Sequence, residues 1–147
     1  MSVIMRLKIK RLDHAVGLPA PATGKAAGFD LASAVDIEVP AHGIRLIGTG
    51  LVIGVPDGYF LGIFARSSLP LKRGLIVANG VGVIDADYCG PADEIKIQVL
   101  NVTDVPVKVL RGERLAQGIV LPCPRIEWDE VTEVSAPTRG GFGSTGS

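Results

Sequence analysis

Short runs in which apolar and polar residues alternate limit the possible folds of this chain more than any other feature. Alternation with a period of two occurs over residues 3–9, 35–39, 59–65, 95–99 and 105–109. Successive side chains of a β-strand point to opposite faces of the sheet, so this period predicts strands that each bury one face. Strands are therefore expected to dominate the structure.

Turn-forming sequences separate these runs: PAHG at residues 40–43, PDG at 56–58 and RG at 111–112. Many short strands joined by such turns predict an all-β fold of the sandwich, jelly-roll or distorted β-barrel kind. The one predicted helix covers residues 69–73. Pro70 and Gly74 limit it to about one or two turns.

Length and composition predict one folded domain followed by an arm. The 147 residues fit a single domain, and 47% of them are apolar while only 5% are aromatic, so the apolar residues are mainly aliphatic ones that suit sheets. From Ala136 the chain is rich in Pro, Thr, Gly and Ser and cannot bury enough apolar surface to stay ordered. We expect a β domain over residues 1–135 and a flexible glycine-rich C-terminal arm over residues 136–147.

Charge and targeting signals restrict the partners. The 15 Lys and Arg residues balance 15 Asp and Glu residues, so no overall field attracts nucleic acid or an anionic membrane. Gly, Pro and charged residues interrupt the apolar runs before they reach the length of a signal peptide or a membrane span. The two cysteines, Cys89 and Cys123, are expected as free thiols. These features predict a cytoplasmic protein without nucleic acid or membrane partners.

The segment GVIDADY (residues 82–88) places an acid at the end of an apolar strand. A carboxylate held there is ionised at neutral pH, so it can orient a water molecule and accept its proton. Asp is also a routine turn residue. On residue chemistry alone, Asp85 is better explained as a turn acid.

Two other segments have the composition of anion-binding sites. Arg66, Ser67 and Ser68 follow a predicted strand and offer forked guanidinium, hydroxyl and backbone donors to phosphate oxygens. A serine helix cap beside a surface arginine explains them equally well. The arm carries GGFGSTG (residues 140–146), whose backbone N–H groups can surround an anion, although it lacks the lysine of a phosphate-binding P-loop.

The order of these segments is more specific than any one of them. The chain carries AGFDL (27–31), RSSL (66–69), GVIDADY (82–88), GERLAQ (112–117) and GFGSTG (141–146), and this series resembles the five ordered motifs of the trimeric dUTPase family. The resemblance covers nearly everything from Ala27 onward. It implies a homotrimer of jelly-roll subunits whose active sites are shared between neighbours and closed by the C-terminal arm.

The resemblance also implies an activity. Members of the family hydrolyse dUTP to dUMP and pyrophosphate with Mg²⁺, by in-line attack of water on the α-phosphorus. This reaction limits uracil incorporation into DNA and supplies dUMP for dTMP synthesis.

Matching the motifs assigns expected roles on the nucleoside side. Asp85 positions and activates the attacking water, while Asp87 receives no chemical role. Tyr88 packs under the deoxyribose, where a ribose 2′-hydroxyl would clash. Asn79 reads the uracil edge, helped by the backbone of Gly82 and Val83.

Further roles concern the phosphates and the arm. Arg66, Ser67, Ser68 and Gln117 are expected at the triphosphate, and Asp30 is expected to hold Mg²⁺ indirectly, through a water molecule. In the arm, Phe142 is expected to stack on uracil, and Arg139, Ser144 and Thr145 are expected to contact the outer phosphates. Gly143 is also expected to bind substrate.

The chain departs from the family pattern twice. Residues 91–93 add length after the Tyr88 motif, and this loop is expected to bulge outward without touching substrate. Only two glycines separate Arg139 from Phe142, which shortens the reach of Arg139.

Two alternatives remain beside the hydrolase. A dCTP deaminase of the same superfamily would need a glutamate motif near the base, which this sequence does not show. A non-catalytic nucleotide-binding β module would have no use for the Asp85 carboxylate.

Overall fold

The computed structural model describes residues 4–146 of the chain. This part contains eleven strands and a single short helical segment. The predicted all-β fold is confirmed. The elements are β1 (Lys8–Arg11), β2 (Phe29–Ala32), β3 (Ile37–Val39), β4 (Ile44–Gly48), β5 (Leu51–Gly54), β6 (Tyr59–Ala65), the π-helical turn η1 (Leu69–Arg73), β7 (Leu75–Val77), β8 (Gly82–Ile84), β9 (Lys96–Asn101), β10 (Val107–Val109) and β11 (Arg114–Pro122).

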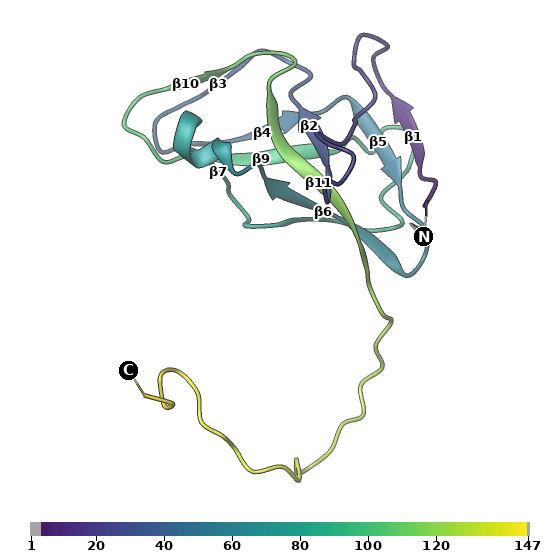
Figure 1. Ribbon diagram of the computed structural model, residues 1–147, viewed down its shortest axis with the longest axis vertical. Helices are drawn as coiled ribbons and strands as arrows, with labels where there is room; N and C mark the ends of the chain where they lie inside the picture. The colour runs from purple at the N-terminus through teal and green to yellow at the C-terminus, as the bar shows by residue number, and fades with distance from the viewer. Residues whose placement is uncertain (1–3, 147) are drawn as a thin grey trace.

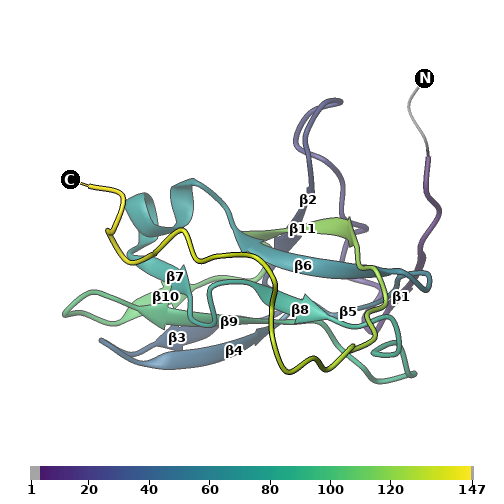
Figure 2. The same ribbon diagram turned by 90° about the horizontal axis from the view of Figure 1, so that it is seen from below.

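The strands pair antiparallel in four groups that enclose one core, as in a jelly roll (Figures 1 and 2). One sheet has the strand order β2-β11-β6-β8, and a second has the order β4-β9-β7. The pairs β1-β5 and β10-β3 complete the body. Figure 2 shows β6 and β11 in a layer above β4 and β9.

The core forms where the predicted alternation coincides with strands that lie inside a sheet. Leu61 and Ile63 of β6 and Ile97 and Val99 of β9 are all buried in the same hydrophobic core. These predicted faces are confirmed. Antiparallel sheets bury one face, so every second side chain of these strands leaves water.

The predicted apolar faces are wrong where the chain has not yet entered a strand. Val35 is 44% exposed and Val105 is 62% exposed, because β3 begins only at Ile37 and β10 only at Val107. Ile9 of β1 is also exposed, since β1 pairs with β5 alone and forms an edge. Val3, predicted on the same face as Ile9, lies outside the described residues.

The helical prediction is confirmed at the same residues. Segment η1 covers Leu69–Arg73 and is followed by Gly74, whose φ of 63° lies in the left-handed region. Its backbone N–H donates to the carbonyl oxygen of Pro70 at 3.1 Å. Glycine adopts this conformation without the strain that a Cβ would add, so the chain can turn directly into β7. Within residues 4–146, no helix has the length and apolar character needed to cross a membrane.

The chain leaves the body after β11 ends at Pro122. Residues 123–146 are all exposed and run outward as an extended segment, drawn from green to yellow in Figure 1. The segment begins well before residue 136, where composition predicts the arm to start. We call residues 123–146 the extended C-terminal segment and keep the word arm for residues 136–147, of which residue 147 lies outside the described residues.

Candidate active site

Neighbouring strands bring two of the predicted triphosphate-binding residues, Arg66 and Gln117, next to Asp30, the predicted indirect metal residue. In the β2-β11-β6 part of the sheet, Gln117 lies between Asp30 and Phe64, and Arg66 directly follows β6. The Asp30 carboxylate is 15% exposed and pairs with the Arg66 Nε at 3.2 Å. Its other oxygen pairs with the Arg114 Nη1 at 3.2 Å. We call Asp30, Arg66, Arg114 and Gln117 the arginine cluster.

Hydrogen bonds to backbone hold the arginine cluster in place. The Gln117 side-chain amide donates to the carbonyl oxygen of Ala65 at 3.2 Å, and the Arg66 guanidinium donates to the carbonyl oxygen of Arg114 at 3.4 Å. Two guanidinium groups around one carboxylate leave a net positive charge. Forked donors with a surplus of positive charge suit phosphate oxygens.

Arg114 received no role from the sequence, although it belongs to the GERLAQ segment. Its contribution depends on register: Arg114 lies opposite Ala32, at the other side of the irregularity where β11 shifts against β2. The only sequence feature that could have indicated a role for Arg114 is that an acid, Asp30, and an arginine occur in two segments that both form strands. Only the strand pairing shows that the two residues meet.

The two serines lie between the arginine cluster and η1. Ser67 is exposed, and Ser68 precedes the first helical residue without making a side-chain capping hydrogen bond. The capping explanation of Ser68 is therefore wrong. Both hydroxyl groups lie next to Arg66 in the chain.

Three of the predicted nucleoside-binding residues, Asn79, Gly82 and Val83, lie on the turn between β7 and β8 and on β8 itself, two strands that belong to different sheets. Asn79 is exposed at this turn, where the Gly80 N–H donates to the Val77 carbonyl oxygen at 3.0 Å and the φ of Gly80 is 74°. A Cβ added to Gly82 would lie 2.9 Å from the Cβ of Ile63. Gly82 therefore allows β8 to approach β6 closely, and Val83 on β8 faces outward.

Asp85 lies directly after β8, exposed, in a pocket of about 490 Å³. Its walls are the β5–β6 turn and the root of the extended C-terminal segment, residues 57–60 and 123–125. Among residues 4–146, the Asp85 carboxylate has no hydrogen bond or ion pair, so it does not cap a turn. The backbone carbonyl of Asp85 accepts a hydrogen bond from the Tyr88 N–H at 3.1 Å.

The arginine cluster and Asp85 lie at opposite ends of β6. Ile84 pairs with Leu61, which places Asp85 level with Phe60, six residues before Arg66. At a strand rise of about 3.3 Å per residue, this separation is about 20 Å. One chain therefore does not bring all the predicted site residues together.

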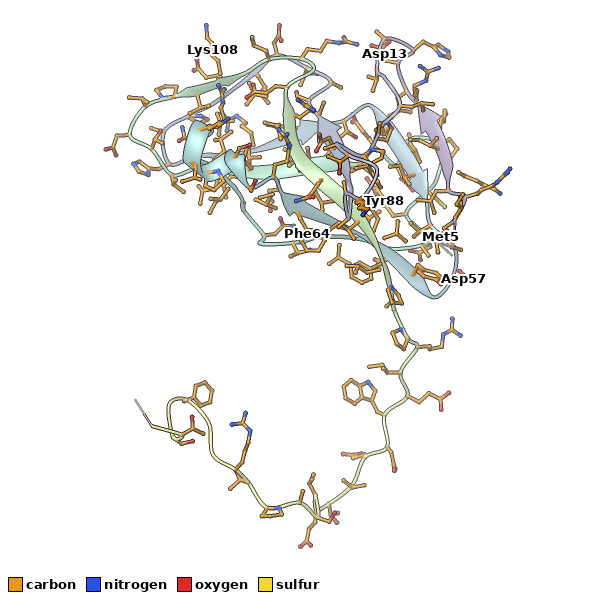
Figure 3. All side chains as sticks on the ribbon, in the orientation of Figure 1. Met5, Asp13, Asp57, Phe64, Tyr88 and Lys108 are labelled. Carbon is orange, nitrogen blue, oxygen red and sulfur yellow. The ribbon has the colours of Figure 1, made fainter. Side chains whose placement is uncertain are left out.

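The predicted arm residues form a third group, away from both others. Arg139, Phe142, Gly143 and Ser144 are exposed, and Figure 3 shows the side chains of the extended C-terminal segment in open space below the body. Phe142 has a φ of 52°, and the Ser144 N–H donates to the carbonyl oxygen of Gly141 at 3.1 Å. The glycine-rich stretch thus makes a tight local turn.

A second pocket of about 420 Å³ lies beside the arginine cluster, between Asp30, Arg111 and residues 15–22. Asp13 ties this loop to Arg111, at 2.9 Å between the carboxylate and the guanidinium. The Ala15 N–H and the Arg111 guanidinium both donate to the Asp13 carboxylate and hold the pKa of Asp13 below its ordinary value.

Comparison with known proteins shows which protein family shares these motifs. The sequence profile described as dUTPase matches residues 14–146. The deoxyuridine 5′-triphosphate nucleotidohydrolase of Anaplasma marginale is 41% identical over 150 residues, covering 98% of this chain and all of that protein. The Nautilia profundicola enzyme of the same name is 42% identical over 144 residues, covering 97% of this chain and 99% of its own length.

Solved structures agree in fold. The dUTPase of Streptococcus mutans superposes with a TM-score of 0.76 at 38% identity, covering 83% of this chain and 98% of that one. The dUTPase of Staphylococcus bacteriophage 80alpha, solved with dUPNHPP, has a TM-score of 0.86 at 24% identity, covering 96% and 98%.

Proposed function

Because this chain belongs to the dUTPase family, we propose that it hydrolyses dUTP to dUMP and pyrophosphate. The observation that carries the proposal is the Asp85 carboxylate. It is exposed at the end of β8, without a partner among residues 4–146, and one turn before Tyr88. An exposed carboxylate held at the end of a paired strand can orient a water molecule and accept its proton.

The proposed chemical step needs little from the protein beyond alignment. Asp85 orients a water molecule for in-line attack on the α-phosphorus and accepts its proton, and pyrophosphate leaves on the opposite side. Phosphoryl transfer of this kind depends mainly on positioning and on neutralising charge on phosphate oxygens. The general base, Asp85, therefore has to be held rigidly, and its place directly after the paired strand β8 holds it in that way.

Selection of the nucleoside is assigned to the segment that runs from the β7–β8 turn through β8 to Tyr88 and includes Asp85. The Asn79 amide both donates and accepts, which suits the edge of uracil. The backbone of Gly82 and Val83 completes that edge, and the ring of Tyr88 lies under the sugar and excludes a 2′-hydroxyl. This arrangement would discriminate dUTP from UTP by steric exclusion.

Binding of the triphosphate is assigned to Arg66, Ser67, Ser68 and Gln117. Mg²⁺ fits this cluster indirectly, because both oxygens of Asp30 already pair with guanidinium groups. Within residues 4–146, no group of three or more His, Cys, Asp or Glu side chains is arranged to hold a metal. Mg²⁺ usually keeps several waters and binds substrate phosphates directly, so Asp30 would hold a metal-bound water. The ion supplies positive charge to the phosphate oxygens.

A homotrimer with shared active sites explains the distance between the two groups of residues. Asp85 and Arg66 are about 20 Å apart along β6 at the usual strand rise. The α-phosphorus of one bound triphosphate therefore cannot be in contact with both side chains of the same chain. A second copy of the chain would place its arginine cluster beside the first copy's Asp85. Closed rotational symmetry then produces one equivalent site for each pair of neighbours.

The arm is proposed to close the site. Phe142 is fully exposed in the single chain, and Gly143 and Ser144 beside it are exposed as well. Stacking of Phe142 on uracil would bury its ring, while Ser144 and Arg139 would add donors at the outer phosphates. Closure would also exclude water other than the attacking molecule.

The proposed reaction fits a cytoplasmic housekeeping role. Removal of dUTP limits the uracil available to DNA polymerases, and its product, dUMP, is the precursor of dTMP. Neither nucleic acid nor a membrane is proposed as a partner, in keeping with the balanced charge.

Pyrophosphate release across a panel of nucleotides tests the function. The full chain with Mg²⁺ is expected to release pyrophosphate from dUTP, and much less from dTTP, dCTP and UTP. Ammonia release from dCTP would instead support the deaminase. Binding of dUTP without any pyrophosphate would support the non-catalytic module and exclude the hydrolase.

A further inference from the structure

Tyr88 is held at both ends by backbone carbonyl groups. Its N–H donates to the carbonyl oxygen of Asp85, and its phenolic hydroxyl donates to the carbonyl oxygen of Glu94 at 2.9 Å. The side chain lies against the body while 39% of the residue stays exposed (Figure 3). The position of the ring's outer end therefore depends on where the carbonyl group of Glu94 lies.

Glu94 is fixed by its own side chain. The Glu94 carboxylate accepts a hydrogen bond from the Gly50 N–H at 2.9 Å, within the turn that joins β4 to β5. A Cβ added to Gly48 would collide with that carboxylate, so the glycine leaves room for it. Next along the chain, the Ile95 N–H donates to the carbonyl oxygen of Leu51 at 2.8 Å. The acceptor for the Tyr88 hydroxyl is thus attached to a turn 44 residues away.

The loop between Tyr88 and Glu94 is closed on itself. The Gly90 N–H donates to the Asp93 carboxylate at 2.7 Å, and the Asp93 N–H donates to the Gly90 carbonyl oxygen at 3.1 Å. The Lys10 ammonium on β1 donates to the carbonyl oxygen of Pro91 at 2.9 Å. The extra residues 91–93 therefore form a braced loop, and it leaves Glu94 in contact with the β4–β5 turn.

We propose that Glu94 is a positioning residue for sugar selection, because it holds the ring of Tyr88 against displacement by a 2′-hydroxyl group. The proposal rests on the proposed function, in which Tyr88 lies under the deoxyribose. A steric wall rejects a larger ligand only if the wall cannot retreat. The Tyr88 clamp, which we define as Tyr88, Glu94 and Gly50, makes retreat costly, because moving the ring breaks a hydrogen bond whose acceptor is itself fixed.

The test compares kcat/KM for dUTP and UTP in the full-length protein. In Glu94→Ala, we expect the ratio of dUTP to UTP to fall about tenfold, the effect of losing about one hydrogen bond's worth of restraint. Glu94→Gln is the matched control. Its amide oxygen still accepts the Gly50 N–H, so it should keep most of the wild-type ratio.

Tyr88→Phe separates the clamp from general damage, because it keeps the ring and removes only the hydroxyl donor. It should lower the ratio to a similar extent, and the double variant with Glu94→Ala should lower it no further, since both changes release the same restraint. The Tyr88→Phe single variant still tests the proposal if Glu94→Ala fails to fold.

An unchanged ratio in Tyr88→Phe or in a folded Glu94→Ala would overturn the proposal. So would an equal loss of activity toward both nucleotides, which indicates a merely structural role. A wild-type protein that releases no pyrophosphate from dUTP would instead refute the proposed function, and this outcome is read from the wild type before any variant is compared.

Discussion

Among single residues, Asp85 has the environment that most directly predicts a chemical effect. Its carboxylate is exposed and makes no hydrogen bond or ion pair within residues 4–146, so Asp85→Asn changes charge and basicity without removing a structural contact. We expect kcat to fall by about a hundredfold or more, the usual contribution of a general base. The dissociation constant for dUTP should change little. Steady-state kinetics together with equilibrium binding measure both quantities.

The matched control for this substitution is Asp87→Asn. Asp87 is the other acid of the same segment and was assigned no chemistry. The kcat of the Asp87→Asn variant should stay within a fewfold of the wild-type value. Equal losses in the two variants would mean that the negative charge of the segment matters and that Asp85 has no special role.

Single residues also show where sequence reasoning stops. Composition left Arg66, Ser67 and Ser68 equally open to a phosphate site and to a helix cap, and the absence of a capping bond from Ser68 removes the second explanation. The sequence does not indicate a role for Arg114, because its partner, Asp30, is 84 residues away in the chain. No local pattern encodes a pairing at that distance, since it arises only from strand register.

At the level of elements, β8 depends on a glycine for its approach to β6. A Cβ at Gly82 would lie 2.9 Å from that of Ile63, closer than carbon atoms pack. Gly82→Ala should therefore lower the free energy of unfolding by about 1–3 kcal/mol, as overpacking does. The added Cβ should also push β8 away from β6. Because Asp85 directly follows β8, this displacement should lower kcat/KM. Denaturant unfolding and kinetics measure the two effects.

Gly17 supplies the control for β8, since nothing lies within 4 Å of a Cβ added there. Gly17→Ala should leave both stability and kcat/KM near their wild-type values. If Gly82→Ala is as stable and as active as Gly17→Ala, the close approach of β8 to β6 has no functional weight.

The described residues of the arm, 136–146, are all exposed and lie away from the body in the single chain. Deleting residues 138–147 should therefore leave the unfolding transition and the oligomeric state unchanged. We expect kcat/KM for dUTP to fall by about a hundredfold or more, because closure over the substrate is lost. Phe142→Ala should reproduce part of the loss through missing stacking. Unchanged turnover in the truncated protein would refute the closing role.

For the whole molecule, the distance between Asp85 and Arg66 predicts complementation. Chains with Asp85→Asn and chains with Arg66→Ala should each be nearly inactive. When equal amounts are unfolded together and refolded, sites between unlike neighbours combine an intact Asp85 with an intact Arg66. Random assembly of a ring makes roughly a quarter of all sites intact. Recovery of activity to that fraction is the measurement.

Mixing each inactive chain with itself is the control for complementation. It should recover nothing. A failure of the mixed sample to recover activity, with mixed assemblies verified by mass spectrometry, would place each site within one chain.

Much of this architecture follows from local pattern. Alternation over residues 59–65 and 95–99 requires strands with one buried face, and Pro70 and Gly74 confine the helix to residues 69–73. The order of the five motifs identifies the family. These inferences succeed because the period of side-chain direction and the conformations open to Gly and Pro are properties of a few adjacent residues.

Other features depend on contacts between distant parts of the chain. Strand register pairs Arg114 with Asp30, brings Glu94 to the β4–β5 turn and sets Asp85 about 20 Å from Arg66 at the usual strand rise. The exposure of Val35 and Val105 likewise reflects where pairing begins rather than where alternation begins. Register and pairing are decided by the lowest free energy of the assembled sheets, and a periodic sequence is compatible with several registers until its partners are in place.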